Sequence, residues 1–370
     1  MHRRAFVYHG SFTALGLGLN RLAPLPWRRS DAAPRASVPK ALVCLVLRGG
    51  VDGMSLVIPY GEPAYYRARP TVAVSPPGES GGALDLDGFF GLHPALEPLV
   101  PLYAGRCLAV IPAVGSTEVS RSHFDAQASL ETGTPGVRST PDGWLNRYLQ
   151  QRGPAPCGWG RAVALAPRLP RLLEGGAPAV ALGRWEEHAA SAPQDSSLRA
   201  AYPGSALGRA LRLVADLLAA DGGWQVAVVD VGGWDSHVAQ GGPSGFLAGR
   251  LADLGASLAA FTDDLGTRLT DVMVVTLTEF GRTVRENAVG GTDHGRGSAM
   301  LILGGGIRGG RVLGRWPGIR HQSRGHDDGV AVTTDVRDVM GEILARHLGA
   351  ERLDHVFPNH DRGGPVGLFD

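Results

Sequence analysis

The sequence predicts an α/β fold in which a mostly parallel central sheet carries helices on both faces. Short, continuously apolar runs recur along the 370 residues and are bounded by Gly, Pro or charged residues. Segments with the apolar spacing of helices separate these runs. Runs without polar alternation are typical of strands buried on both faces, and strand–helix alternation is typical of parallel sheets.

The first half of the chain supplies two strands and three helices. "ALVCLVL" at 41–47 and "CLAVIP" at 107–112 are apolar throughout and are predicted as buried strands. Helical spacing follows at 93–104, at 122–132, where a serine stands at the capping position, and at 143–151.

The second half repeats the alternation. Its apolar runs predict three further strands at 225–231, 271–277 and 299–304. Its helical patterns lie at 205–220, 245–265 and 334–348. The Gly- and Pro-rich stretch at 133–205 has weak periodicity and is interpreted as a cap or insertion in a single domain over 36–370.

Composition excludes several classes of function. A formal net charge of +1 gives no field that would attract nucleic acid, so no nucleic-acid partner is expected. The three cysteines form no short-spaced pair, which argues against a disulfide framework or a cysteine-based zinc site and leaves one disulfide open. Lys40 is the only lysine, so no phosphate-binding GxxxxGK[ST] loop exists, and no strand–GxGxxG–helix unit supports a dehydrogenase.

The N-terminal 1–35 segment has the character of an export signal. Arg3 and Arg4 precede a weakly apolar, Gly-containing stretch and then small residues at which a peptidase could cut. This pattern resembles a twin-arginine signal, whose machinery carries folded proteins; the alternative is a chance Arg pair before a short buried helix. The stretch is too short and too Gly-interrupted for a membrane span, so no transmembrane anchor is expected after signal removal.

Acidic and imidazole side chains follow the predicted strands. Asp52 follows the first, Glu279 and Arg282 follow the strand at 271–277, and the remaining candidates are Asp230, Asp235, His237, Asp293 and His294. The carboxyl ends of parallel strands share one edge, so these side chains are expected to meet there. A mixture of carboxylates and imidazoles suits Zn²⁺ or Mn²⁺ better than Mg²⁺ or Ca²⁺, which remain alternatives.

Asp293 and His294 stand in a loop framed by Gly291, Gly295 and Gly297. The glycines would let the loop bend so that both side chains reach one ion. The alternative is an Asx-turn without a ligand.

Several longer motifs resemble one family. "LRGGVDGMSLVIP", "SRSHFDAQASLETG", "VDVGGWDSH", "TEFGRT" and "GGTDHGRGSAMLILGGG" are similar to domain-of-unknown-function family 1501, a family of exported bacterial proteins placed in the alkaline phosphatase superfamily. The resemblance spans residues 41–348 and implies an alkaline-phosphatase-like fold with a two-metal site.

The resemblance also implies roles for single residues. Asp52, Asp293 and His294 match the ligands of one ion, and Asp235 and His237 resemble those of the other. Asp230 stands where alkaline phosphatases carry an acidic magnesium ligand. His326 is the candidate for the last metal-binding histidine, with four competitors, His321, His347, His355 and His360.

The nucleophile is less well marked. Ser122 stands at a predicted helix N-terminus, which favours an anionic substrate, and His123 follows it as a ligand or an acid/base. Ser122 is equally interpreted as a helix cap, and Thr117 is a rival. Arg282 or Arg296 would neutralise charge on the transferred group. The Cys-x-Pro-x-Arg motif of sulfatases is absent.

Together these features predict a metal-dependent hydrolase of phosphate or sulfate esters, periplasmic or extracellular through twin-arginine export. Its expected cofactors are divalent metal ions, its expected partner is a small-molecule or polymer ester, and no organic cofactor is expected. The alternative is a non-catalytic exported binding or assembly protein that retains the fold with one metal or none.

Overall fold

The computed structural model describes residues 39–153, 160–183, 185, 200–220, 223–319 and 329–370. Val38–Asp370 forms one compact unit. The predicted export signal at 1–35 and His326 lie outside the described residues.

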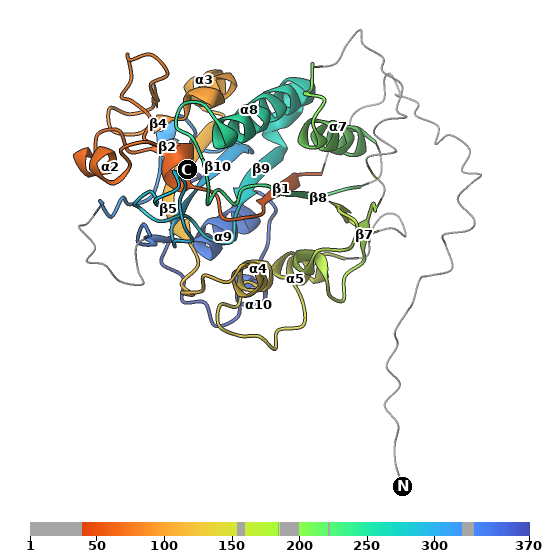
Figure 1. Cartoon of the computed structure of the whole chain (residues 1–370). Coiled ribbons are helices and arrows are strands. Elements are labelled where there is room, and N and C mark those ends of the chain that lie inside the picture. The colour runs from red at the N-terminus through yellow and green to blue at the C-terminus, as the bar shows by residue number, and fades with distance from the viewer. Residues whose placement is uncertain (1–38, 154–159, 184, 186–199, 221–222, 320–328) are drawn as a thin grey trace. The chain divides into compact units, whose positions relative to one another are not determined.

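The core of this unit is a nine-stranded sheet in the order β11-β5-β10-β9-β1-β8-β6-β7, with β12 also pairing with β5. Figure 1 labels β5, β10, β9, β1, β8 and β7 of this sheet. Its strands are β1 (Ala41–Leu47), β5 (Leu108–Gly115), β6 (Ala162–Leu165), β7 (Ala179–Ala181), β8 (Val226–Val231), β9 (Val272–Leu277), β10 (Ser298–Gly304), β11 (Arg311–Val312) and β12 (Thr334–Asp335). All seven residues of β1 are buried, because this strand lies between β8 and β9.

One strand runs against the others. β1 is parallel to β8 and β9, and β6 is parallel to β7 and β8. β10 is antiparallel to both β9 and β5. The start of β10 therefore lies at the edge where the parallel strands end, and the loop between β9 and β10 stays at that carboxyl edge.

Helices cover both faces of the sheet. The alternation of side chains along β1 sends Val43 and Leu45 into one core and Leu42 and Cys44 into the other. The first core includes apolar residues of α7 (Ala206–Ala219) and α8 (Phe246–Leu265). The second includes residues of α4 (His123–Thr132), α5 (Trp144–Gln150), α9 (Val336–Arg346) and α10 (Leu353–Val356). The predicted α/β class with a mostly parallel sheet is confirmed.

Shorter elements complete the unit. A three-stranded sheet contains β2 (Val57–Ile58), β4 (Gly91–Leu92) and β3 (Leu84–Asp85). The remaining short helices are α1 (Gly53–Leu56), α2 (Pro63–Ala68), α3 (Val100–Ala104), η2 (Pro94–Leu99), η3 (Arg171–Leu173) and η4 (Gly266–Thr270). The pattern at 93–104 is thus two helical pieces, η2 and α3, with Pro98 inside the first.

The stretch at 133–205 contributes to the main sheet. β6 pairs with β8, and β7 extends the sheet beyond β6. The strands are only four and three residues long and consist largely of alanine, so they give no apolar run comparable to the other strands. These parts of the predicted cap or insertion belong to the domain core.

Candidate metal centre

Four segments meet at the carboxyl edge of the sheet. The turn after β1 holds residues 48–52, the loop after β8 holds 232–245, and the connection from β9 to β10 holds 278–297. The fourth segment, 116–122, leaves β5 and leads into α4. The side chains that chemistry could use come from these segments and from His123, the first residue of α4.

Three side chains form a group that could hold a metal ion. One ligand atom each from His123, Asp235 and His294 lies within 4.8 Å of the others. His237 joins them, because its Nε2 is 2.9 Å from His294 Nε2 and 3.1 Å from Asp235 Oδ1. The His123 and His237 rings each contact the His294 ring, with centroids 4.4 and 4.6 Å apart. We call these four residues the histidine cluster.

Each histidine of the cluster is fixed through its Nδ1. His123 Nδ1 lies 2.8 Å from Glu279 Oε1, and His237 Nδ1 lies 2.9 Å from Asp293 Oδ1. His294 Nδ1 lies 2.8 Å from the carbonyl oxygen of Arg121. Carboxylates and carbonyls only accept hydrogen bonds, so each neutral ring carries its proton on Nδ1. Its Nε2 then presents a lone pair.

These lone pairs require a partner. His237 Nε2 and His294 Nε2 face each other at 2.9 Å, a contact that needs a proton or a cation between them. His123 Nε2 is buried without a hydrogen-bond partner in the part of the chain that the structure describes. Histidines oriented by a carboxylate or carbonyl at one nitrogen, with the other free, are typical of metal ligands. The residues present therefore fit a metal ion.

Asp235 is ionised at neutral pH. Burial raises the pKa of its carboxyl, but the hydrogen bond and the charge of Arg282 lower it and hold the pKa below its ordinary value. Arg282 Nη2 lies 2.5 Å from Asp235 Oδ1.

Arg282 is buried and also donates to the carbonyl oxygens of Gly49, Gly50 and Thr292. Its guanidinium therefore holds Asp235 and joins the turn after β1 to the β9–β10 connection.

The side chains of Asp293 and His294 point in different directions and have different partners. His294 belongs to the histidine cluster, whereas Asp293 orients His237 and accepts a hydrogen bond from Asn287 Nδ2 at 3.2 Å. Burial raises the pKa of Asp293, but the hydrogen bonds from His237 and Asn287 outweigh it and lower the pKa. Gly291 and Gly295 are required here, because an added Cβ would lie 2.2 Å from the carbonyl of His237 and 2.3 Å from the backbone of Arg282, respectively.

Glu279 holds His123 in place. Its side chain is fully buried, and its Oε1 also accepts hydrogen bonds from Gly49 N at 2.9 Å and Gln127 Nε2 at 3.0 Å. Burial raises the pKa of Glu279, but these hydrogen bonds outweigh it and lower the pKa. The sequence places Glu279 after a predicted strand but does not indicate that it binds His123. The only sequence feature that connects Gln127 with the site is its position four residues after His123 on the same helix.

Two predicted ligands lie outside the histidine cluster. Asp52 is 1% exposed and accepts two hydrogen bonds from Arg69, at 2.5 and 2.9 Å. Burial raises its pKa, but the charge and hydrogen bonds of Arg69 outweigh burial and lower it. Asp230 accepts from Arg48 Nε at 3.1 Å and Nη2 at 2.9 Å. Neither carboxylate is brought to the histidines.

Ser122 is exposed and caps α4, where its Oγ accepts a hydrogen bond from Asp125 N at 3.4 Å. The rival Thr117 accepts from Arg337 Nη2 at 3.4 Å.

The competing histidines have other contacts. His347 lies 3.0 Å from the Ala41 carbonyl, and His360 lies 2.8 Å from Asp338 Oδ1. His321, like His326, lies outside the described residues.

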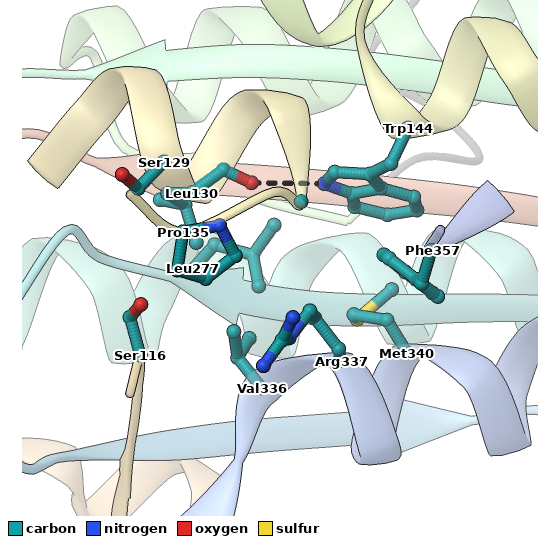
Figure 2. A pocket seen from close by; sticks show the side chains of 11 residues that line it. Ser116, Ser129, Leu130, Pro135, Trp144, Leu277, Val336, Arg337, Met340 and Phe357 are labelled. Atoms are coloured by element: carbon teal, nitrogen blue, oxygen red, sulfur yellow. Dashed lines mark hydrogen bonds between the residues drawn. The ribbon is translucent and has the colours of Figure 1, made fainter. Parts of the chain in front are cut away.

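Two cavities lie away from the histidine cluster. One, shown in Figure 2, has about 10 Å³ and is lined among others by Ser116, Trp144 and Arg337; Trp144 Nε1 donates to the Leu130 carbonyl at its edge. This volume fits about one water molecule, too little for an ester substrate. The other, of about 420 Å³, is a polar hollow lined among others by Gln151 and His355.

Several solved structures resemble this chain at low identity. The C-terminal periplasmic domain of EcEptC from Escherichia coli in complex with Zn is 11% identical, with a TM-score of 0.39 over 73% of this chain and 74% of that chain. The lipoteichoic acid synthase LtaP from Listeria monocytogenes is 11% identical, with a TM-score of 0.40 over 85% and 73%. A protein in the alkaline phosphatase superfamily from Vibrio parahaemolyticus is 12% identical, with a TM-score of 0.37 over 72% and 60%.

No curated protein matches the chain. One family model does, over residues 163–355, which include Asp235, His237, Asp293 and His294. Since this match covers more than half of the chain, the protein belongs to DUF1501, a family described as proteins of unknown function.

Proposed function

We propose that this protein is an exported metal-dependent hydrolase of phosphate or sulfate esters. The observation that carries the metal centre is the convergence of three imidazole Nε2 atoms and one ionised carboxylate on one place, with every Nδ1 already bound. The sequence resemblance to the alkaline phosphatase superfamily supports the reaction class.

The donor set favours Zn²⁺ or Mn²⁺. His123, His294, His237 and Asp235 supply three nitrogen donors and a carboxylate, whereas Mg²⁺ and Ca²⁺ prefer oxygen donors. The two-metal arrangement that the resemblance implies needs a second ligand set. Because Asp52 and Asp230 pair with arginines, we place a single ion at the histidine cluster.

An ion bound there would polarise an ester oxygen and lower the pKa of a water or hydroxyl group. The protein's own residues set the geometry. Glu279 and Asp293 keep the protons of His123 and His237 on Nδ1, and Arg282 holds Asp235 ionised. Ser122, directly before His123, is the proposed nucleophile, and the N-terminus of the ten-residue helix α4 behind it favours an anionic ester group.

Export through the twin-arginine machinery is part of the proposal and follows from Arg3 and Arg4 in the N-terminal segment. It implies a periplasmic or extracellular location. Among the helices of the described residues, none combines the length and apolar character that a membrane span requires.

A non-catalytic binding protein is the second candidate. The observation that favours it is that both predicted reacting side chains already have hydrogen-bond partners within the protein. Ser122 Oγ caps α4, and the guanidinium of Arg282 donates to Asp235 and to backbone carbonyls. Such a protein would bind an ion at the histidine cluster without turnover.

Metal content tests the proposal. Protein purified without chelator is measured by mass spectrometry as wild type, as His294→Ala and as the matched control His355→Ala, whose histidine lines the polar hollow away from the cluster. We expect about one equivalent of Zn or Mn in wild type and control and a loss in His294→Ala. Wild type is then assayed on p-nitrophenyl phosphate and p-nitrophenyl sulfate.

Two results would contradict the proposal. Bound metal with no hydrolysis of either p-nitrophenyl ester supports the binding protein. Absence of metal, with no thermal stabilisation when Zn²⁺ or Mn²⁺ is added, rules out the metal centre itself.

A further inference from the structure

Gln240 is a fully buried glutamine in the loop after β8, and its carboxamide joins three segments of the chain. Its Nε2 donates to Asp52 Oδ2 at 2.7 Å and to Ser55 Oγ at 3.2 Å. Its Oε1 accepts from Ser236 Oγ at 2.9 Å and from Thr292 Oγ1 at 2.6 Å. The orientation of the amide follows from chemistry, because the ionised carboxylate of Asp52 can only accept.

The two hydroxyl partners stand beside metal-centre residues. Ser236 lies between Asp235 and His237, and Thr292 directly precedes Asp293 and His294. Backbone hydrogen bonds join the same loops, from Thr292 N to the Ser236 carbonyl at 3.1 Å and from Gln240 N to the Gly290 carbonyl at 2.8 Å. One carboxamide oxygen thus spans the two loops that carry His237 and His294.

Asp52, which accepts a hydrogen bond from Gln240 Nε2, is part of a buried ion pair. Asp52 binds Arg69, which is itself fully buried and donates to the carbonyls of Thr283 at 2.8 Å and Val284 at 2.9 Å. Thr283 in turn holds Asp293, since its Oγ1 accepts from Asp293 N at 3.1 Å and its N donates to the Asp293 carbonyl at 2.8 Å. Asp52 is therefore connected to the Asp293–His294 segment from two sides.

We propose that Gln240 is a positioning residue of the metal centre, which sets the distance between His237 and His294 and thereby the affinity for the ion. Asp52 acts in the same network as the fixed acceptor that orients the Gln240 amide. This inference rests on the proposed metal centre. Removal of a partner that hydrogen-bonds a ligand directly costs about 10- to 100-fold in metal affinity in other metalloproteins. Gln240 acts one contact further out, through Ser236 and Thr292, so its effect belongs at the lower end of that range.

The test compares two buried amides. Gln240→Met keeps the length of the side chain and removes its four hydrogen bonds. Asn146→Leu is the matched control: Asn146 is also fully buried, and its amide bonds Leu173 O, Ala177 O, Ala177 N and Gln150 Nε2, all outside the metal centre. The dissociation constant for Zn²⁺ is measured by competition with a chelating dye, and the visible spectrum of the Co²⁺-loaded protein reports coordination geometry.

We expect the Zn²⁺ dissociation constant of Gln240→Met to rise about tenfold with an altered Co²⁺ spectrum, while Asn146→Leu loses stability but binds as wild type. Equal binding by all three proteins would overturn the positioning role and leave the metal centre intact. Failure of wild type to bind Zn²⁺ or Co²⁺ would overturn both.

Gln240→Met carries a risk of misfolding. Ser236→Ala and Thr292→Val each remove a single hydroxyl, and each is expected to weaken Zn²⁺ binding with wild-type unfolding cooperativity. Wild-type affinity in both would contradict the proposal.

Discussion

Glu279 offers a graded test of how the metal centre is built. Oε1 of its buried carboxylate accepts three of its four side-chain hydrogen bonds, from His123 Nδ1, Gln127 Nε2 and Gly49 N, while Oε2 accepts the fourth from Thr278 Oγ1 at 3.2 Å. Glu279→Gln can keep its carbonyl at the Oε1 position and place its amide opposite Thr278. The substitution therefore preserves the shape and removes only the negative charge behind His123.

The expected magnitude follows from this geometry. Without the charge, His123 Nε2 is a weaker donor to the ion, and we expect about a tenfold loss of Zn²⁺ affinity, or about 1.4 kcal/mol. Glu279→Ala also leaves His123 Nδ1 and the buried Gly49 N without this acceptor, so the loss of Zn²⁺ affinity approaches about 100-fold and the unfolding free energy falls by about 1–3 kcal/mol. Zn²⁺ competition titrations and urea unfolding measure the two quantities. Zn²⁺ affinity in Glu279→Gln equal to wild type would refute the assignment of His123 as a ligand.

Two further predictions concern stability. Burial is the largest cause that lowers the pKa of His93 and His347 in the folded protein. As the pH falls through about 6.5, these histidines therefore bind protons in the unfolded chain before they do so in the folded chain. The stability that they contribute is present above that pH and is lost as the pH falls below it. The unfolding free energy, measured by urea unfolding, should therefore decrease between pH 7.5 and 5.5, by at most about 1.4 kcal/mol per pH unit for each histidine. The unfolding free energy of His347→Gln should decrease less over the same range. An equal decrease in wild type and His347→Gln would contradict this role of His347. Arg69→Met should lower the unfolding free energy by about 3–5 kcal/mol, because Asp52 is left buried and unpaired, and Asp52→Asn in the same chain should recover part of it. Equal stability of the single and double variants would show that the charge of Asp52 is not the cause.

Apolar patterning predicted most of the sheet, because β1, the first four residues of β8 and the first four residues of β9 are buried hydrophobic runs that any fold must cover. It could not predict the direction of β10, which depends on the path of the connection before it. It also missed β6 and β7, whose apolar runs of four and three residues are too short to stand out from the Gly- and Pro-rich sequence around them.

In the candidate site, too, the sequence could predict some residues and not others. Asp235, His237 and His294 could be found because acids and imidazoles at strand exits share an edge of the sheet. Glu279 and Gln240 could not be assigned, since their roles depend on hydrogen bonds to residues 156 and 188 positions away in the chain. For Asp52, the partner Arg69 stands on another element, and nothing in the local sequence pairs the two.

The place of β1 determines when the domain can complete its folding. Its register joins residues 41–47 to 226–231 on one side and to 272–277 on the other. During synthesis β1 therefore emerges long before β8 and β9, and its apolar side chains stay exposed until both strands have been made. Sheets built from pairings so distant in sequence fold slowly, and an exposed, unpaired strand is prone to aggregation. An N-terminal fragment that stops before β8 lacks both neighbours of its central strand, so we expect the domain to fold only after most of the chain has been released from the ribosome.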